Sequence, residues 1–239
     1  MFTFKGKNSN DMFLTIENRL TFDSSERDIE FIAIPGRDGE LIIDNKRYNA
    51  VTRSIPCILR LPKNKSVEHV ISDISNWLNI DHQYHDFRWS GDPEFIYKAM
   101  FFQTFNMQRV IREFGRVVLN FKMHPIKYLK TGLEEFIISN NTTLHNPLSL
   151  PSKPIIKIVG QGSIKLKIND QEVDLRWLEE GGVIIDSENQ TITTIDGNKS
   201  LSRHLYSYPF PVLEVGPNMI TYEGDIENVS IIPRFGELI

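Results

Sequence analysis

Cysteine is almost absent from this chain, which has a single one, Cys57, in 239 residues. One thiol can form neither an intrachain disulfide nor a thiolate-based zinc cluster, so stability must come from packing or from partners. In residues 54–61, one alternating set is Ile55, Cys57, Leu59 and Leu61, and the other is Ser54, Pro56, Ile58 and Arg60. This alternation is typical of a strand with one buried face. Cys57 falls on that face and is interpreted as a core residue rather than a nucleophile.

Long hydrophobic runs are also missing. The first six residues lack the apolar core of a signal peptide, and no later run reaches the length of a membrane span. We therefore expect synthesis in the cytoplasm and no membrane partner. The 27 basic and 31 acidic residues leave a net charge of -4, which argues against a protein built to neutralise a nucleic-acid backbone.

The chain lacks a convincing set of catalytic residues. No Gly-x-Ser-x-Gly elbow occurs, so a hydrolase-type serine triad is not indicated. The adjacent carboxylates Glu134 and Glu135, like Glu179 and Glu180, point to opposite faces of a strand rather than facing each other across a cleft. We expect no enzymatic activity and assign no catalytic residue.

Metal and cofactor sites are equally poorly supported. His82 and His85 lie among acidic residues, but residues 81–93 are predicted to be a loop, where three-residue spacing does not align two ligands. Gly160 and Gly162 follow a strand, yet another strand follows them instead of the helix that phosphate binding requires. These glycines are interpreted as a hairpin turn, and we expect neither a metal nor a cofactor.

The first half predicts strands and one amphipathic helix. The Pro- and Gly-rich residues 35–40 separate two apolar runs and predict a hairpin, and a second turn is expected at residues 44–46. Apolar residues then recur at helical spacing from residue 67 to 78, with Ser66 as the N-cap. Strands are predicted at residues 95–105 and 116–123, with a projecting hairpin tip at 106–115.

The second half predicts an antiparallel sandwich. Residues 131–154 contain closely spaced prolines and are interpreted as a connecting region with one short strand. Short strands then follow at spacings of about ten residues, which is typical of a β-sandwich. The predicted domains are residues 1–130 and 131–239. Residues 228–239 either pack on the second domain or return to the first.

Two groups of side chains are candidates for interaction surfaces. Arg109, Arg112 and Arg116 lie in or beside the hairpin tip, where they either contact a neighbouring subunit or form a solvated face. Trp177, Tyr206 and Tyr208 either stack on a sugar or serve packing or an interface. The residue pattern leaves both alternatives open.

Several segments, taken in order, resemble the distal tail (Dit) proteins of siphophages. In the first half these are residues 35–40, 45–48, the helix from Ser66, 91–93 and 121–128. In the second half they are residues 154–162, 210–220 and 232–234. The order and spacing of these segments carry the resemblance.

The resemblance implies an N-terminal β-sandwich with a helix and a long hairpin, and a C-terminal galectin-like β-sandwich. It further implies a homo-hexameric ring at the tail tip of a virion. The implied partners are the major tail protein, the tape measure protein, a tail-associated lysin or fibre protein and a receptor-binding protein, and the genome passes through the ring lumen without specific binding. The chain is too short for the carbohydrate module of larger relatives, so saccharide recognition is left to a separate adhesin. The alternatives are a stand-alone lectin-like protein and a glycan-degrading enzyme.

Overall fold

The computed structural model describes residues 1–17, 23–62, 65–105, 107–111 and 114–239. The chain divides into two compact units, Met1–Lys127 with Leu238–Ile239, and Tyr128–Glu237. Each unit has its own hydrophobic core. Strands dominate both units, and the described residues contain one α-helix, so the β-rich fold class is confirmed. No helix in the described ranges is long and apolar enough to cross a membrane.

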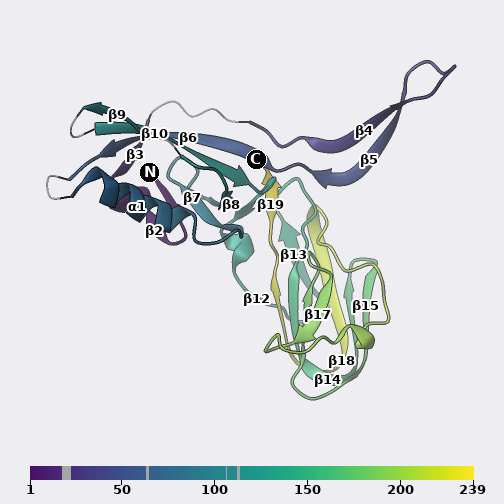
Figure 1. The fold of residues 1–239 in the computed structure, drawn as a ribbon. Coiled ribbons are helices and arrows are strands. Elements are labelled where there is room, and N and C mark those ends of the chain that lie inside the picture. The colour runs from purple at the N-terminus through teal and green to yellow at the C-terminus, as the bar shows by residue number, and fades with distance from the viewer. Residues whose placement is uncertain (18–22, 63–64, 106, 112–113) are drawn as a thin grey trace. The chain divides into compact units, whose positions relative to one another are not determined.

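The first unit contains the early strands and the helix (Figure 1). Its elements are β1 (Phe2–Phe4), β2 (Lys7–Asn8), β3 (Leu14–Ile16), β4 (Arg27–Ala33), β5 (Glu40–Tyr48), β6 (Val51–Arg60), α1 (Val67–Leu78), β7 (His85–Trp89), β8 (Phe95–Phe101), β9 (Met107–Ile111) and β10 (Phe114–Met123). A short 3-10 helix, η1 (Ser9–Met12), precedes β3. β11 (Ile126–Leu129) and β19 (Gly236–Leu238) lie where the chain passes between the units.

The main sheet of the first unit has the order β2-β1-β7-β8-β10-β6-β3, and β9 pairs with β10. β6 and β10 are antiparallel along their whole length, and Cys57 lies opposite Val117. Both are buried, as the alternation predicts. Burial raises the pKa of the Cys57 thiol to about 12, which keeps it protonated and unreactive.

Helix α1 begins where the sequence predicts. The Ser66 side chain accepts a hydrogen bond from the His69 amide, which satisfies one unpaired donor of the first turn. The apolar stripe of α1 enters the core through Val70, Ile74, Trp77 and Leu78. Trp77 Nε1 also donates to the carbonyl oxygen of Phe4 at 2.9 Å, so the helix is joined to the first strand by a polar contact as well.

Three local predictions in the first unit differ from the structure. The expected loop at residues 81–93 contains β7, because Phe87 supplies a buried side chain between β1 and β8, and the turn-forming residues lie only at its ends. The expected turn at residues 44–46 is a bulge inside β5, where Lys46 has φ 54° and its amide donates to Asp44 Oδ1. The strand predicted at 95–105 ends at Phe101.

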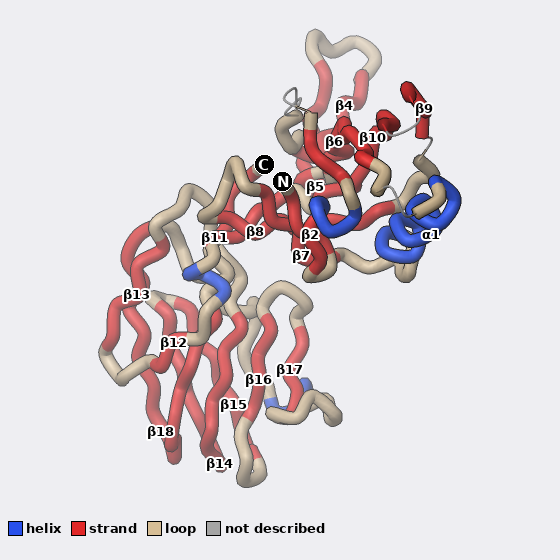
Figure 2. The backbone as a smooth tube through the Cα atoms, turned by 90° about the vertical axis from the view of Figure 1, so that its left-hand side faces the viewer, coloured by secondary structure: helices blue, strands red, loops and turns tan. Residues whose placement is uncertain are grey.

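The second unit is a sheet that curls around its own core (Figure 2). Its order is β12-β18-β14-β16-β17, with β13 on β18 and β15 on β14. The strands are β12 (Phe136–Ile137), β13 (Thr142–Asn146), β14 (Ile155–Ile168), β15 (Gln171–Leu178), β16 (Val183–Asp186), β17 (Thr191–Thr194) and β18 (Gly216–Ile232). Two 3-10 helices, η2 (Thr131–Leu133) and η3 (Ser202–His204), complete it. The predicted connecting region at 131–154 therefore lies inside this unit, since β12 and β13 both pair with β18.

The predicted hairpin turn at Gly160 and Gly162 is wrong. β14 continues through these residues and pairs with β18, which is likewise one continuous strand. A Cβ at Gly160 would lie 2.4 Å from the Asp225 carbonyl oxygen, and one at Gly224 would lie 2.6 Å from that of Ser163. The glycines therefore permit two bent strands to approach closely, rather than reversing the chain. Leu213 forms only a single bridge, with Ser152.

Candidate interaction surfaces

Strands β4 and β5 form a two-stranded sheet of their own, which we call the β4–β5 arm (Figure 1). The predicted hairpin is confirmed: the Arg37 amide donates to the Ile34 carbonyl, and Gly36 and Gly39 adopt φ of 79° and 77°. Other strands of the described residues do not pair with either one. An isolated two-stranded hairpin is at best marginally stable in water, and pairing with other described strands gives the arm no further support.

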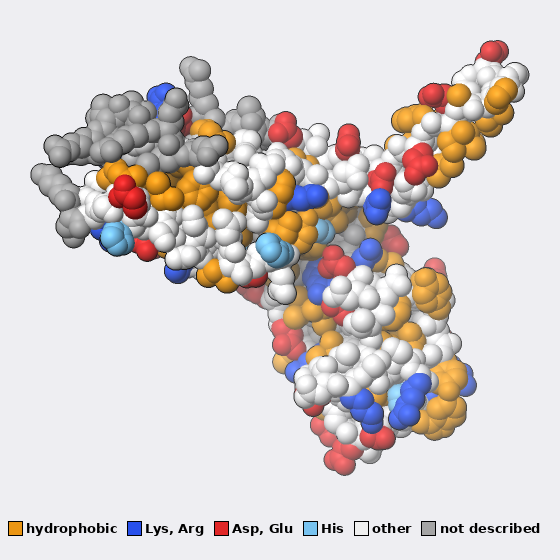
Figure 3. All heavy atoms as spheres, in the orientation of Figure 1, with side chains coloured by type: hydrophobic (Ala, Val, Ile, Leu, Met, Phe, Trp, Pro, Cys, Tyr) orange, Lys and Arg blue, Asp and Glu red, His pale blue; other side chains and the backbone are white. Residues whose placement is uncertain are grey.

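The half of the arm nearest the turn carries large apolar side chains on both faces. Phe31 and Ile42 are directly opposite each other on one face and are 60% and 62% exposed. Ile32 and Leu41 face each other on the other side and are also exposed. Hydrophobic side chains line the visible side of the arm in Figure 3. Such contiguous apolar exposure is typical of a protein-binding surface.

The other half of the arm is charged. Arg27 donates to Asp44 through Nε at 2.9 Å and Nη2 at 2.6 Å, and Arg47 Nε lies 2.5 Å from Asp28. The hydrogen bonds from the two arginines lower the pKa of Asp44 and of Asp28. These exposed pairs cross the two strands and fix their register. The arm is thus polar at one end and apolar at the other.

The three predicted arginines are described only in part. Arg112 lies outside the described residues, as does the side chain of Arg109, although β9 and β10 do pair as a hairpin. Arg116 Nε lies 3.1 Å from Glu17 Oε1, and 68% of the Arg116 side chain is exposed. Arg116 therefore has a partner within the chain.

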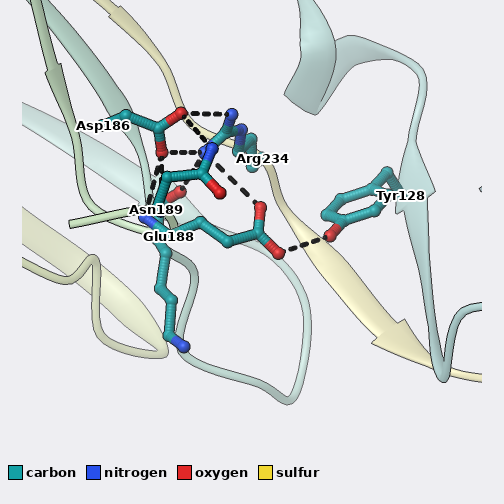
Figure 4. Close-up of polar contacts among 6 residues, drawn as sticks. Tyr128, Asp186, Glu188, Asn189 and Arg234 are labelled. Carbon is teal, nitrogen blue, oxygen red and sulfur yellow. Dashed lines mark hydrogen bonds and ion pairs between the residues drawn. The ribbon is translucent and has the colours of Figure 1, made fainter. Parts of the chain in front are cut away.

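A polar cluster connects the first and last residues of the second unit (Figure 4). Arg234 donates to both oxygens of Asp186, at 2.6 and 3.1 Å, and also approaches Glu188. Tyr128 donates to Glu188 at 3.3 Å, and Asn189 donates to Asp186. Burial opposes ionisation of Asp186, but the hydrogen bonds from Arg234 and Asn189 outweigh it and lower its pKa. Burial also raises the pKa of the Tyr128 phenol.

This cluster is a structural element, which the residue pattern did not reveal. Asp186 and Arg234 are both largely buried, so the pair requires geometry that only the folded unit supplies. The only sequence signal was the Pro233–Arg234 pair noted in the family resemblance. Backbone hydrogen bonds also join the two ends of the unit: the Arg234 amide donates to the Gly132 carbonyl, and the Leu129 amide donates to the Phe235 carbonyl.

Of the three predicted aromatic residues in the second unit, Trp177 and Tyr206 are in contact, and Tyr208 lies apart from them. The Trp177 and Tyr206 rings meet edge to face at 5.3 Å, and the Arg176 guanidinium lies 4.6 Å from the Tyr206 centroid. Tyr208 is 78% exposed and has no ring contact with this pair among the described residues. Figure 3 shows hydrophobic and basic side chains together beside η3. The structure thus assembles Trp177, Tyr206 and Arg176, a residue that sequence reasoning missed.

His85, one of the two histidines considered as metal ligands, contacts Asp81 instead. His85 Nε2 lies 2.6 Å from Asp81 Oδ1, and Lys5 lies 3.3 Å from the same atom. The hydrogen bond with His85 lowers the pKa of Asp81 to about 2. No group of three or more metal-ligating side chains is found in the described part of the chain.

Comparison with solved structures identifies the fold class as that of phage tail hub and baseplate proteins. The chain aligns with the crystal structure of the Dit protein of phage SPP1, described as a paradigm of the hub adsorption apparatus in phages that infect Gram-positive bacteria. The TM-score is 0.74 at 15% identity, over 96% of each chain. A baseplate chain of phage p2, in its activated conformation with Sr, matches at a TM-score of 0.50 and 7% identity, over 92% of this chain and 89% of that one. This protein therefore has the Dit fold, as the ordered sequence segments predict.

Sequence-level comparisons add no further relative. No family model matches the chain. No curated protein matches it either.

Proposed function

We propose that this protein is a structural distal tail protein of a siphophage, in which six copies form a ring at the tail tip. The observation that supports this most strongly is the agreement with the SPP1 hub protein over almost the full length of both chains. The match includes both units, so it concerns the whole architecture and not one common β-sandwich. On this proposal the protein has no enzymatic role.

The β4–β5 arm supports assembly independently of the comparison. Phe31, Ile32, Leu41 and Ile42 lie on a ribbon that is too thin to bury them. Their burial against another protein would be favourable by about 25 cal/mol per Å² of apolar surface. In a ring of identical subunits every arm meets the same surface of its neighbour, so one heterologous, head-to-tail contact is repeated until the ring closes.

The proposed partners follow from a ring at the junction of tail tube and tip. The major tail protein and the tape measure protein lie on one side, and a tail-associated lysin or fibre protein on the other. A receptor-binding protein attaches to the outside. On this proposal the first unit, which carries the arm, closes the ring, and the second unit offers a docking surface.

Light scattering and negative-stain imaging of the purified full chain test the proposal. We expect particles containing six copies of the 27.7 kDa chain, seen as rings along their axis. A chain that stays monomeric at high concentration, also after addition of its tail neighbours, would contradict the ring. Turnover of a glycan that a single carboxylate substitution abolishes would contradict the non-enzymatic role.

A further inference from the structure

Trp177 lies at a bulge in β15. Gly162 of β14 pairs with Leu178, and Ile164 pairs with Leu175, so Arg176 and Trp177 together oppose the single residue Ser163. Trp177 has φ 54°, in the left-handed region that favours glycine. Bulges of this kind re-aim side chains, and they are frequent beside functional sites.

The fold offers no packing reason for a tryptophan at this position. Its side chain is 65% exposed, in contrast to Trp77, which is 2% exposed in the first core. A bulky residue in an unfavourable backbone region that gains little burial is best explained by a role outside folding. The bulge therefore points to a ligand that contacts the indole.

The surroundings of Trp177 hold it in a defined arrangement. The Tyr206 amide donates to the Asp174 carbonyl at 2.8 Å, and the Asp174 amide donates to Ser207 Oγ at 2.9 Å. These bonds fix Tyr206 beside β15. Arg176 donates to Asp174 Oδ2 through Nε and Nη2, at 3.1 and 2.6 Å. Within the described residues neither bond uses Arg176 Nη1, so this group can donate to a ligand.

We propose that Trp177, Tyr206 and Arg176 form a binding site for a neutral hexopyranose glycan. The C–H face of a pyranose ring is complementary to the electron-rich face of an indole or phenol ring. The guanidinium Nη1 and the hydroxyl of Tyr206, a residue that is 49% exposed, would hydrogen-bond the hydroxyl groups at the sugar rim. This assignment goes beyond the proposed ring, does not depend on it, and departs from the expectation that saccharide recognition is left to a separate adhesin.

A glycan fits better than a protein partner because the apolar area is small and its surroundings are polar. A specific protein interface buries about 800 Å² on each side around an apolar centre. Here the charged Arg176–Asp174 pair adjoins the Tyr206 ring directly, so the surface around the aromatic rings is mixed rather than apolar. On β14 and β15, Lys165 and Lys167 form further charged pairs with Glu172.

A neighbouring hollow gives room for more than one sugar. It has a volume of about 340 Å³, and its lining includes Glu179, Asp196 and His204. His204 also connects the hollow to the aromatic site, because its Nδ1 lies 2.9 Å from the Arg176 carbonyl oxygen. Carboxylates are acceptors for sugar hydroxyls and would repel acidic polysaccharides. The geometry therefore favours a neutral oligosaccharide.

The test uses the full chain and an array of immobilised oligosaccharides of glucose, galactose, N-acetylglucosamine and rhamnose, with uronic-acid oligosaccharides for comparison. We expect the wild-type chain to bind at least one neutral glycan. Trp177→Gly, which removes the ring but suits the backbone, should weaken this binding at least tenfold, whereas Trp177→Phe should retain most of it. Arg176→Lys keeps the positive charge but lacks the planar guanidinium with its several N–H donors, and it should weaken binding to a smaller extent.

The control is Phe102→Ala, which removes an exposed ring from the first unit and should leave glycan binding unchanged. Absence of binding to every neutral glycan would overturn the proposal, as would equal binding by Trp177→Gly. It would also be overturned if Trp177→Gly lost affinity for a tail-tip protein while the array stayed empty. Light scattering on the same samples reports ring formation separately, so failure of the glycan site is distinguishable from failure of the ring.

Discussion

The two units carry surfaces of different chemistry, made in different ways. On the first, the β4–β5 arm exposes aliphatic side chains and Phe31 on a ribbon without a core. On the second, Trp177 projects from a bulge in β15, and Tyr206 meets it from the loop that follows η3, over a sheet with its own core. The arm is suited to burial against another protein surface, whereas the aromatic site is suited to a ligand with one apolar face and a polar rim. On the two proposals, assembly belongs to the first unit and recognition to the second.

The largest expected effect concerns the arm. Phe31→Asp combined with Ile42→Asp places two charges on one face of the ribbon, where burial against a neighbour would desolvate them. We expect complete loss of rings in light scattering. The circular dichroism spectrum should remain that of a folded chain, because neither residue belongs to a hydrophobic core.

The matched control for the arm is Ile137→Asp in the second unit, where the isoleucine is 77% exposed. Rings should persist in this variant. If the arm variant still forms rings, the apolar ribbon is not an assembly surface and the contrast between the units fails.

A charge reversal in the β9–β10 hairpin tests a second proposed contact of the first unit. If Arg109 and Arg112 pair with carboxylates of the neighbouring subunit, Arg109→Glu combined with Arg112→Glu should break the ring and leave a folded monomer. Circular dichroism and light scattering measure the two outcomes. Intact rings would remove this hairpin from the interface and leave the arm as its main element.

The polar cluster at the ends of the second unit should govern the stability of that unit alone. Arg234→Met leaves Asp186 largely buried without its bidentate partner, and we expect a loss of about 3 kcal/mol in the free energy of unfolding of the second unit. Hydrogen exchange of the β14 and β18 amides measures it. Lys167→Met, which breaks an exposed pair with Glu172, is the control and should cost less than about 1 kcal/mol.

The same cluster predicts a dependence on pH. Because the pKa of Asp186 is lowered in the folded unit, its carboxylate stabilises the fold above the unfolded pKa of about 3.9, and this contribution is lost as the pH falls through the folded value. Wild type should exceed Asp186→Asn in stability at pH 7, and the two should converge as the pH drops below about 4. A difference that stays constant down to pH 2 would show that the charge of Asp186 does not matter.

Much of the fold could be read from local patterns. The N-cap Ser66, the apolar stripe of α1 and the alternation around Cys57 each depend on neighbours in sequence, and the structure confirms them. The errors arose where contacts with backbone far away in the sequence determine the local structure. Gly160 looked like a turn because its contact with Asp225, 65 residues later, cannot be seen in the sequence.

The candidate sites were less predictable for the same reason. The apolar run around Phe31 was visible, but only the strand pairing shows that no core covers it. Trp177 was singled out by residue type, whereas its meeting with Tyr206 depends on a bulge and on a loop that returns to β15. Arg234 and Asp186 lie 48 residues apart, and nothing near either one indicates the pair.

The smallest expected effect is the change in stability when Trp177, at the bulge in β15, is replaced. If Trp177 is retained for binding and not for folding, Trp177→Gly should leave the free energy of unfolding unchanged or raise it by up to about 1 kcal/mol, because glycine adopts φ 54° without the steric cost that a side chain incurs. Trp177→Ala removes the same indole but keeps a Cβ in the left-handed region, so it should be less stable than the glycine variant. Urea unfolding of the full chain measures both. A clear loss of stability in both variants would mean that the indole supports the fold, and the contrast between an assembling first unit and a recognising second unit would lose its structural basis.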